Sequence, residues 1–359
     1  MKPVSVGILG CGAIAPAYLG HLCRTFSGLV DVRACADVVH DAAVARAREF
    51  GVARSCSPEE LLADPAVELV VNLTPAPAHH AASRRILDAG RHLFSEKPLA
   101  LGREHARELL ELAARRGLRV GGAADTFLGA SLQLCRRFVD EGRIGTPVAA
   151  TALTTVGMFD SVRYHQVYRG ALLDLGPYYL TALVALLGPV KRVCGAAEIR
   201  FAQKPHPAGS PDEGKSFAVD IPSSAAAALE FADGTVASLV ATCDTPLYSP
   251  RVEIFGTRGR LQLNDANDYG GRVVLHTAEG EQAFDSAPGF GGKGRGLGVV
   301  EMALALREGR APRSDGALMY HVLDVLLAVH DSSAAAAHAT IASRVGRPEP
   351  FEFETAVRG

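Results

Sequence analysis

The chain has 359 residues, of which 48% are hydrophobic and 21% are charged, and its formal net charge is −2 at pH 7. A chain of this length can form two domains, each with a core of its own. The nearly balanced charge gives no electrostatic reason to expect nucleic acid or an anionic membrane as a partner.

The cysteines and the apolar runs indicate the compartment. The seven cysteines are scattered along the chain without a C-x-x-C pair, a pattern that favours reduced thiols over a disulfide framework or a zinc site. No apolar run reaches the roughly 18 residues of a membrane span. A strand-like stretch begins at Val4, so we expect no signal peptide. We therefore expect a water-soluble, cytoplasmic protein that binds neither nucleic acid nor membranes.

Short apolar runs alternate with helical patterns over residues 1–125. The helical patterns lie at residues 13–24, 41–51, 80–90 and 103–117. The apolar runs predict buried strands at residues 4–10, 30–37, 67–75, 92–98 and 119–125. This alternation predicts an α/β domain of the Rossmann type, with a parallel sheet covered by helices on both faces.

After Asp125 the pattern changes to paired strands with fewer helices. Residues 225–243 predict a hairpin around an Asp-Gly turn. Further strands are predicted at residues 146–157, 251–265 and 272–284, and helices at 129–145, 298–309 and 316–338. We expect residues 126–359 to form an α+β domain with a mostly antiparallel open sheet. This second domain would bind the substrate and could join copies of the chain into a homodimer or homotetramer.

The stretch "GILGCGAIA" (residues 7–15) has the G-x-G-x-x-A spacing, directly after one predicted strand and before a predicted helix. In that setting the glycines let the backbone turn tightly and approach a pyrophosphate, whose charge faces the helix N-terminus. A plain glycine-rich turn is the alternative, but the strand and helix on either side favour a dinucleotide site. The residues expected to contact the cofactor are Gly10, Cys11, Gly12, Ala13 and Ile14.

An acidic residue, Asp37, ends the second predicted strand. A carboxylate at that place can bind the hydroxyls of the adenosine ribose. It would repel a 2′-phosphate, and no arginine follows directly in "ADVVHD". We therefore expect NAD rather than NADP as the cofactor.

The stretch "SEKPLA" (95–100), with "NLTP" (72–75) and His79 upstream, resembles the Gfo/Idh/MocA oxidoreductase family. That family includes glucose–fructose oxidoreductase, inositol dehydrogenases and many sugar dehydrogenases. The likeness covers essentially the whole chain, because the antiparallel second domain and an acid at residue 174 also fit. The resemblance implies an NAD-dependent oxidoreductase that acts on a CH–OH group of a small molecule.

The resemblance further implies that Lys97 lies beside the nicotinamide and the substrate hydroxyl, with Glu96 among the cofactor contacts. Pro98 biases Lys97 away from helical geometry, and the family often has this peptide bond in the cis form. The positive charge of an oxidised nicotinamide disfavours a protonated lysine next to it. A neutral Lys97 amine could then take the hydroxyl proton as the hydride leaves the carbon.

Another segment, at the end of the third predicted strand, also matches the family. It contains Leu73, Thr74, Pro75 and His79, which the resemblance assigns to the pyrophosphate and the nicotinamide ribose. A role for Thr74 as a helix cap is the alternative.

Three further segments have no firm assignment from the sequence. Asp125, Thr126 and Phe127 follow the fifth predicted strand and are either substrate or nicotinamide contacts or hinge residues. Tyr164 precedes the acid at residue 174 and could bind substrate hydroxyls. The glycine-rich stretch 289–298 is expected to be a loop that enters the next helix.

The stretch "LLDLGPYYL" (172–180) places Asp174 and Tyr178 four residues apart. In one helix this spacing puts both side chains on the same face. The family carries an acid here, usually followed four residues later by a histidine, and both point toward the lysine. This chain has tyrosine instead, as glucose–fructose oxidoreductase and dihydrodiol dehydrogenases do. The unperturbed pKa of tyrosine, about 10, is far above that of histidine, so both proton transfer and a packing role stay open for Tyr178.

Together these residues predict an NAD(H)-dependent oxidoreductase of a sugar, glycoside or cyclitol, without a metal. Lys97 would move the proton, and Asp174 and Tyr178 would orient the substrate hydroxyl. Two alternatives are an enzyme of the same fold acting on a non-sugar carbonyl or a dihydrodiol, and a non-catalytic dinucleotide-binding regulator. The presence of both Lys97 and Asp174 argues against the regulator.

Overall fold

The computed structural model describes residues 2–167, 170–263, 265–286 and 294–352. The chain forms two compact units. The first contains Met1–Leu128 with the described parts of Phe290–Tyr320 and Phe351–Gly359, and the second contains Gly129–Gly289 and His321–Pro350. The predicted domains, residues 1–125 and 126–359, are each continuous in sequence, whereas these units are not.

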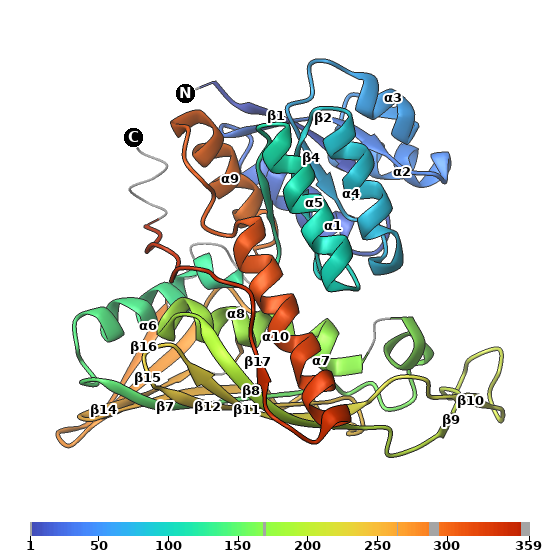
Figure 1. The fold of residues 1–359 in the computed structure, drawn as a ribbon. Coiled ribbons are helices and arrows are strands. Elements are labelled where there is room, and N and C mark those ends of the chain that lie inside the picture. Colours follow the sequence, from blue (N-terminus) through green and yellow to red (C-terminus); the bar gives the residue numbers. More distant parts are fainter. Residues whose placement is uncertain (1, 168–169, 264, 287–293, 353–359) are drawn as a thin grey trace. The chain divides into compact units, whose positions relative to one another are not determined.

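The first unit is built on a six-stranded sheet in the order β3-β2-β1-β4-β5-β6 (Figure 1), and every pair in it is parallel. Its strands are β1 (Val4–Leu9), β2 (Val30–Ala36), β3 (Ser55–Cys56), β4 (Leu69–Asn72), β5 (His92–Ser95) and β6 (Val120–Gly122). All four residues of β4 are buried, as expected for a parallel strand covered on both faces. The predicted Rossmann-type fold is confirmed.

Helices connect these strands along the chain. The predicted helix at residues 13–24 is divided in the structure into a short α-helix, α1, and a π-helical turn, η1. The helical segments of Met1–Leu128 are α1 (Ala15–Gly20), η1 (His21–Thr25), α2 (His40–Phe50), α3 (Pro58–Ala63), η2 (Ala76–Ala78), α4 (His79–Asp88), α5 (Arg103–Arg115) and η3 (Thr126–Leu128).

Polar contacts explain why a late segment belongs to the first unit. Arg307, on α9 (Leu297–Glu308), donates to both carboxylate oxygens of Glu68 at 2.6 and 2.7 Å. Its guanidinium also donates to the carbonyl oxygens of Lys2 and Pro3. Hydrogen bonds from Arg307 lower the pKa of Glu68 to about 2. These contacts fasten α9 to the start of the chain, a link that residue patterns alone do not reveal.

The second unit contains a nine-stranded sheet in the order β16-β15-β14-β13-β7-β12-β11-β8-β17 (Figure 1). Only the β12–β7 pair is parallel. Its strands are β7 (Pro147–Thr155), β8 (Val190–Glu198), β11 (Ser224–Phe231), β12 (Val236–Thr242), β13 (Arg251–Gly256), β14 (Gly259–Leu263), β15 (Gly271–Thr277), β16 (Gly280–Ser286) and β17 (Ala339–Thr340). The predicted antiparallel character is confirmed, with this one parallel pair added.

Side chains alternate on the central strands of this sheet. In β12, Ala237, Leu239 and Ala241 are buried, while the residues between them face away from the core. The hairpin of β11 and β12 turns at Gly234, which has φ +95°, as the Asp-Gly pair predicted. One sheet face is therefore covered and the other is open, which is typical of an antiparallel sheet.

The helices of the second unit provide the other half of its core. They are α6 (Ala130–Asp140), η4 (Arg163–Val167), α7 (Gly170–Asp174), α8 (Gly176–Leu187) and the later part of α10 (Gly316–Ala335). Every residue of α8 is buried. A separate two-stranded ribbon is formed by β9 (Gln203–Pro205) and β10 (Ser216–Ala218). Among the described residues, no helix combines the length and the apolar content needed to cross a membrane.

Candidate active site

The first-unit residues predicted to bind the cofactor all follow the carboxyl ends of parallel strands. The glycine loop follows β1, Asp37 follows β2, the Leu73–His79 segment follows β4, Glu96–Lys97 follows β5, and Asp125–Phe127 comes after β6. Because the carboxyl ends of parallel strands meet at one edge, the sheet brings these segments to the same side of the unit. The order of the strands reverses between β1 and β4, the place where such sheets bind ligands.

The two glycines of the loop have different roles. Gly10 has φ +101°, and a Cβ built on it would lie 2.6 Å from the carbonyl carbon of Leu73 and 2.7 Å from the nitrogen of Thr74. A side chain at position 10 would therefore separate the loops after β1 and β4. A Cβ on Gly12 would meet no atom within 4 Å, and both Gly12 and Ala13 are exposed. The loop thus presents bare backbone to open space, as a pyrophosphate requires.

Asp37 holds the glycine loop by its carboxylate. Its Oδ2 accepts from the backbone N–H of Cys11 at 2.7 Å, and its Oδ1 accepts from that of Val39 at 2.8 Å. Ionised carboxylates have further acceptor positions on both oxygens, so Asp37 can still receive ribose hydroxyls. Open space at Gly12 and an anchored acid beside it fit a dinucleotide.

The loop after β4 is organised by Asn72, the first residue of the NLTP stretch, to which the sequence analysis assigned no role. Its buried side-chain oxygen accepts from Thr74 Oγ1 at 2.7 Å, and its amide nitrogen donates to Ser83 Oγ at 3.0 Å. His79 is 2% exposed, and its ring nitrogens lie 2.7 Å from the Thr74 oxygen and 2.6 Å from the Pro98 oxygen. Burial lowers the pKa of His79. His79 therefore links the loop after β4 to the turn after β5, whereas the resemblance assigned it to cofactor contact.

The Glu96-Lys97-Pro98 turn is held in place by Glu96. The Tyr18 hydroxyl donates to Glu96 Oε1 at 2.7 Å, and the Lys97 N–H donates to Glu96 Oε2 at 3.0 Å. Glu96 is 7% exposed, and both of its carboxylate oxygens accept hydrogen bonds from the protein. The Lys97–Pro98 peptide bond is cis, as the resemblance implied. Tyr18 was missed because its position on α1, two elements before β2, carries no signal for a contact with residue 96.

The residues after β6 differ in their surroundings. Asp125 is fully buried, and its Oδ2 accepts from the N–H of Gly298 at 2.7 Å. This bond favours the structural alternative for Asp125, since it fixes the start of α9. Thr126 is also fully buried, and its Oγ1 has no hydrogen-bond partner among the described residues. Phe127 is 1% exposed. Of the three, Thr126 has the polar atom that a bound molecule could satisfy.

The predicted substrate residues of the second unit lie on two helices. Asp174 is the last residue of α7, and Tyr178 lies in the first turn of α8. The two helices meet at Leu175, because Pro177 has no N–H to continue the helical bonds, but the backbone angles of Leu175 remain right-handed helical (φ −100°, ψ −30°). Asp174 is half-buried, whereas Tyr178 is 3% exposed. The neighbouring Tyr179 is buried and donates to Asp265 at 2.8 Å, as expected for a core tyrosine.

Two other segments remain from the sequence prediction. Tyr164 is half-buried on η4. In the glycine-rich stretch 289–298, Lys293 lies outside the described residues, and Gly298 already belongs to α9.

Two sequence models of one family match consecutive parts of the chain. The first, described as an oxidoreductase family with an NAD-binding Rossmann fold, matches residues 4–123. The second, described as the GFO/IDH/MocA C-terminal domain, matches residues 132–262. The two matches coincide with the parallel sheet of the first unit and with the first half of the second unit.

Individual proteins agree with this match. An uncharacterized oxidoreductase of Rhizobium meliloti, ORF334, is 32% identical over 77% of this chain and 80% of its own. The 1,5-anhydro-D-fructose reductase of Ensifer adhaerens is 27% identical over 79% of this chain and 83% of its own. Levoglucosan dehydrogenase in complex with NADH and L-sorbose shares the fold, with a TM-score of 0.84 and 20% identity over 96% of this chain and 100% of its own.

The fold and the motifs at its strand ends define an oxidoreductase with an NAD-binding Rossmann domain. The chain belongs to the Gfo/Idh/MocA family of oxidoreductases.

Proposed function

We propose that the protein transfers a hydride between NAD(H) and a secondary alcohol or ketone of a sugar, glycoside or cyclitol. The observation that carries the proposal is the position of Lys97 at the carboxyl end of β5. Its turn is fastened by Glu96 to α1 and by His79 to Thr74, the residue that packs on Gly10. These contacts connect the turn that carries Lys97 to the loop that fits a dinucleotide.

Lys97 would act as the proton-transfer group. In the oxidation direction its neutral amine takes the proton of the substrate hydroxyl, and in the reduction direction its ammonium returns that proton to the new alkoxide. The hydride chemistry itself is supplied by NAD when it is bound. The rigid turn around Lys97 matters because an acid or base must be positioned accurately to be effective.

Asp174 and Tyr178 would orient the substrate. The half-buried carboxylate of Asp174 can accept hydrogen bonds from sugar hydroxyls, and the phenol of Tyr178 can donate one. Asp174 ends α7 and Tyr178 lies in the first turn of α8, on either side of Leu175. The name of the 1,5-anhydro-D-fructose reductase relative supports a sugar derivative as the substrate.

The test is a panel of sugars, glycosides and cyclitols, offered to the purified protein with NAD or NADP while reduced cofactor is followed by absorbance. We expect turnover of at least one member with NAD, together with NAD in the mass spectrum of nucleotides that co-purify. Turnover of dihydrodiols or non-sugar carbonyls alone would contradict the sugar assignment. Tight NAD binding without turnover of any compound would favour a regulator.

The same proposal includes the location and the assembly of the protein. All seven cysteines are free thiols, which supports the cytoplasm. The open face of the nine-stranded sheet carries small and apolar side chains, with Val240 between Ala226 and Leu153 on the neighbouring strands. Val240 is 36% exposed. We propose that two copies associate through this face, which the oligomeric mass in solution tests.

A further inference from the structure

The second unit contains a completely buried lysine, Lys204, on β9. Its side chain is 0% exposed and its ammonium forms an ion pair with Asp244. The ammonium nitrogen also lies 3.1 Å from His165 Nε2 and 4.2 Å from the ring centre of Phe159. A buried ammonium is stable only when such partners replace the water it has lost. The partners of Lys204 must therefore stay in place for the unit to fold.

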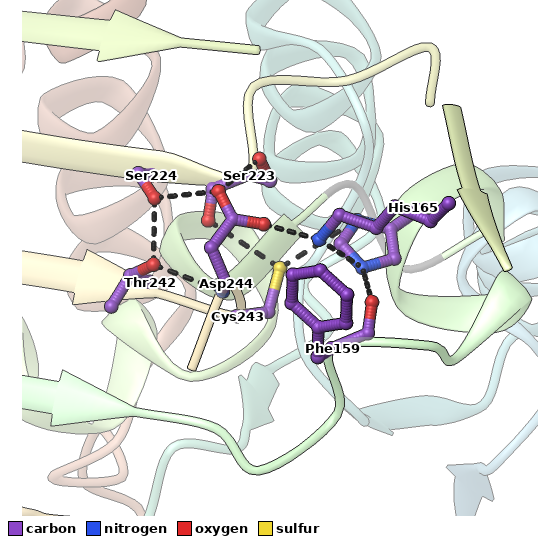
Figure 2. A network of polar contacts seen from close by, with 8 residues as sticks. Phe159, His165, Ser223, Ser224, Thr242, Cys243 and Asp244 are labelled. Atoms are coloured by element: carbon purple, nitrogen blue, oxygen red, sulfur yellow. Dashed lines mark hydrogen bonds and ion pairs between the residues drawn. The ribbon is translucent and has the colours of Figure 1, made fainter. Parts of the chain in front are cut away.

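Asp244 is fixed by more than the lysine. Its Oδ2 accepts from Ser223 Oγ at 2.7 Å and from Ser224 Oγ at 2.9 Å, and its own N–H donates to Thr242 Oγ1 at 3.0 Å (Figure 2). Burial opposes the charge on Asp244, but Lys204 and the two serines outweigh it and lower the pKa of this carboxyl. The carboxylate is thus a rigid anchor at the end of the sheet.

His165 takes its orientation from this anchor. Burial and the neighbouring Lys204 lower the pKa of His165, so its ring is neutral. Nε2 lies 3.1 Å from the Lys204 ammonium nitrogen and 3.0 Å from the Phe159 carbonyl oxygen. Nδ1 lies 3.8 Å from Cys243 Sγ (Figure 2), and that thiol lies 3.4 Å from the Ser223 carbonyl oxygen. The imidazole is therefore held on both sides.

The cluster of Lys204, Asp244, His165 and Cys243 joins segments that are far apart in the sequence. His165 lies on η4, the helical turn that also holds Tyr164 and precedes α7. The start of α7 meets the same region, because a Cβ on Gly170 would lie 2.4 Å from the carbonyl oxygen of Pro222, next to Ser223. His165 is thus held by the cluster and Gly170 packs against Pro222, and α7 then ends at Asp174.

His165, Cys243 and Asp244 also have ligand atoms within 4.8 Å of one another, close enough to hold a metal ion. Lys204 weighs against a metal here, because its ammonium already contacts Asp244 and His165 and would repel a second cation. The lysine provides the positive charge that a metal would bring. Bound metal is therefore an outcome that the experiment must be able to detect.

We propose that Lys204 is a positioning residue for substrate binding. Its ammonium holds His165, and with it η4, against the sheet, an arrangement that we call the lock. The lock determines the positions of Tyr164 on η4 and of Asp174 at the end of α7. The proposal rests on the proposed function for the role of Asp174. The lock itself concerns only the second unit, so it can be measured without turnover.

The experiment uses the full chain with Lys204→Met, Asp244→Asn and the double variant. Lys215→Met is the matched control, because Lys215 lies in the same β9–β10 region with its side chain 71% exposed. The measurements are KM and kcat, NAD affinity, melting temperature, metal content and hydrogen exchange of residues 159–174. For Lys204→Met we expect KM about tenfold higher or more, a smaller change in kcat, faster exchange of 159–174 and NAD affinity within about twofold. Lys215→Met should match the wild type.

The double variant separates positioning from simple stability. Lys204→Met alone leaves a buried carboxylate without its partner and lowers the melting temperature. Removing both charges should recover much of that loss, while KM stays high and exchange of 159–174 stays fast. Recovery of KM together with the melting temperature would overturn the proposal, as would unchanged exchange in Lys204→Met or stoichiometric metal in the wild type. If the wild type turns over no compound but its exchange responds as expected, the lock stands and the proposed function fails.

Discussion

The candidate site residues of the first unit follow the ends of neighbouring parallel strands, whereas those of the second unit lie on short helical segments. In the first unit, the sheet itself brings Gly10, Asp37, Thr74 and Lys97 to one edge. In the second, Asp174 ends a five-residue helix that depends on packing against distant residues such as Pro222. Parallel strands place their site residues by topology, while short helices need tertiary partners. Substitutions in the two units should therefore lower activity for different structural reasons.

The largest effect is expected at Lys97. Lys97→Ala should cut turnover by roughly 10²–10⁴, the range for losing a positioned acid or base, while NAD affinity stays nearly intact. The turn itself should survive because Glu96 accepts from the Lys97 N–H, which alanine keeps. Steady-state kinetics and an NAD titration on the same variant check this, with Lys215→Ala as a control. A variant that keeps most of its turnover would mean that another group moves the proton.

The second effect concerns Tyr178, in the second unit. Tyr178→Phe keeps the buried ring and removes only the oxygen, so turnover should fall about tenfold or more with little change in melting temperature. Tyr178→His should recover part of the activity and move the pH optimum toward neutrality, since imidazole titrates near pH 6.5.

Tyr179→Phe is the matched control for Tyr178. It removes the hydroxyl that donates to Asp265 at 2.8 Å, so it should lower stability by about 1 kcal/mol and leave turnover unchanged. Full activity of Tyr178→Phe would reduce Tyr178 to a packing role. Lys97 and Asp174 would then be the chemical pair.

A smaller, specific effect is expected at Asp37. NAD should bind at least tenfold tighter than NADP, about 1.4 kcal/mol or more, because the Asp37 carboxylate repels a 2′-phosphate. Asp37→Ser with Val38→Arg should narrow or invert this ratio, since Val38 is 87% exposed and an arginine there can reach the phosphate. Equal affinities in the wild type would contradict the assignment of Asp37 to the ribose.

The smallest effect is a pH dependence at Glu68. Its pKa is lowered from 4.5 to about 2 by Arg307, so its contribution to stability is complete above about pH 4.5 and is lost as the pH falls toward 2. The Glu68 side chain is 37% exposed, which limits the contribution to about 1 kcal/mol or less. Urea unfolding of the wild type and Glu68→Gln should differ at pH 7 and converge near pH 2. A difference that does not change with pH would rule out this ion pair as its source.

The same contrast explains what the sequence could predict. Alternating apolar runs and helical patterns were enough for the parallel sheet, and the Asp-Gly turn was enough for the β11–β12 hairpin, because these signals are local. The contact of Tyr18 with Glu96 could not be predicted, since nothing in residue spacing joins α1 to the turn after β5. The same holds for Arg307 and Glu68, which are far apart in the chain. The break at Leu175 could have been anticipated from Pro177.

The site of the second unit was predicted least completely. Asp174 and Tyr178 were found through a motif, but the residues around them were not. Lys204 and Asp244 lie in unrelated stretches, and a lysine is usually expected on the surface. Only the folded sheet shows that this lysine is inside and paired. Buried charged residues such as Lys204 are therefore the hardest part of this site to predict from the sequence.

Gly10 has a consequence for anyone who wishes to redesign the enzyme. A side chain at position 10 would clash with Leu73 and Thr74, and His79 connects Thr74 to Pro98. The glycine loop and the lysine-bearing turn are therefore linked through residues 73–79. We therefore expect a substitution at position 10 to lower turnover as well as cofactor affinity. Cofactor preference is therefore best altered at Val38, because its exposed side chain can be exchanged without disturbing these contacts.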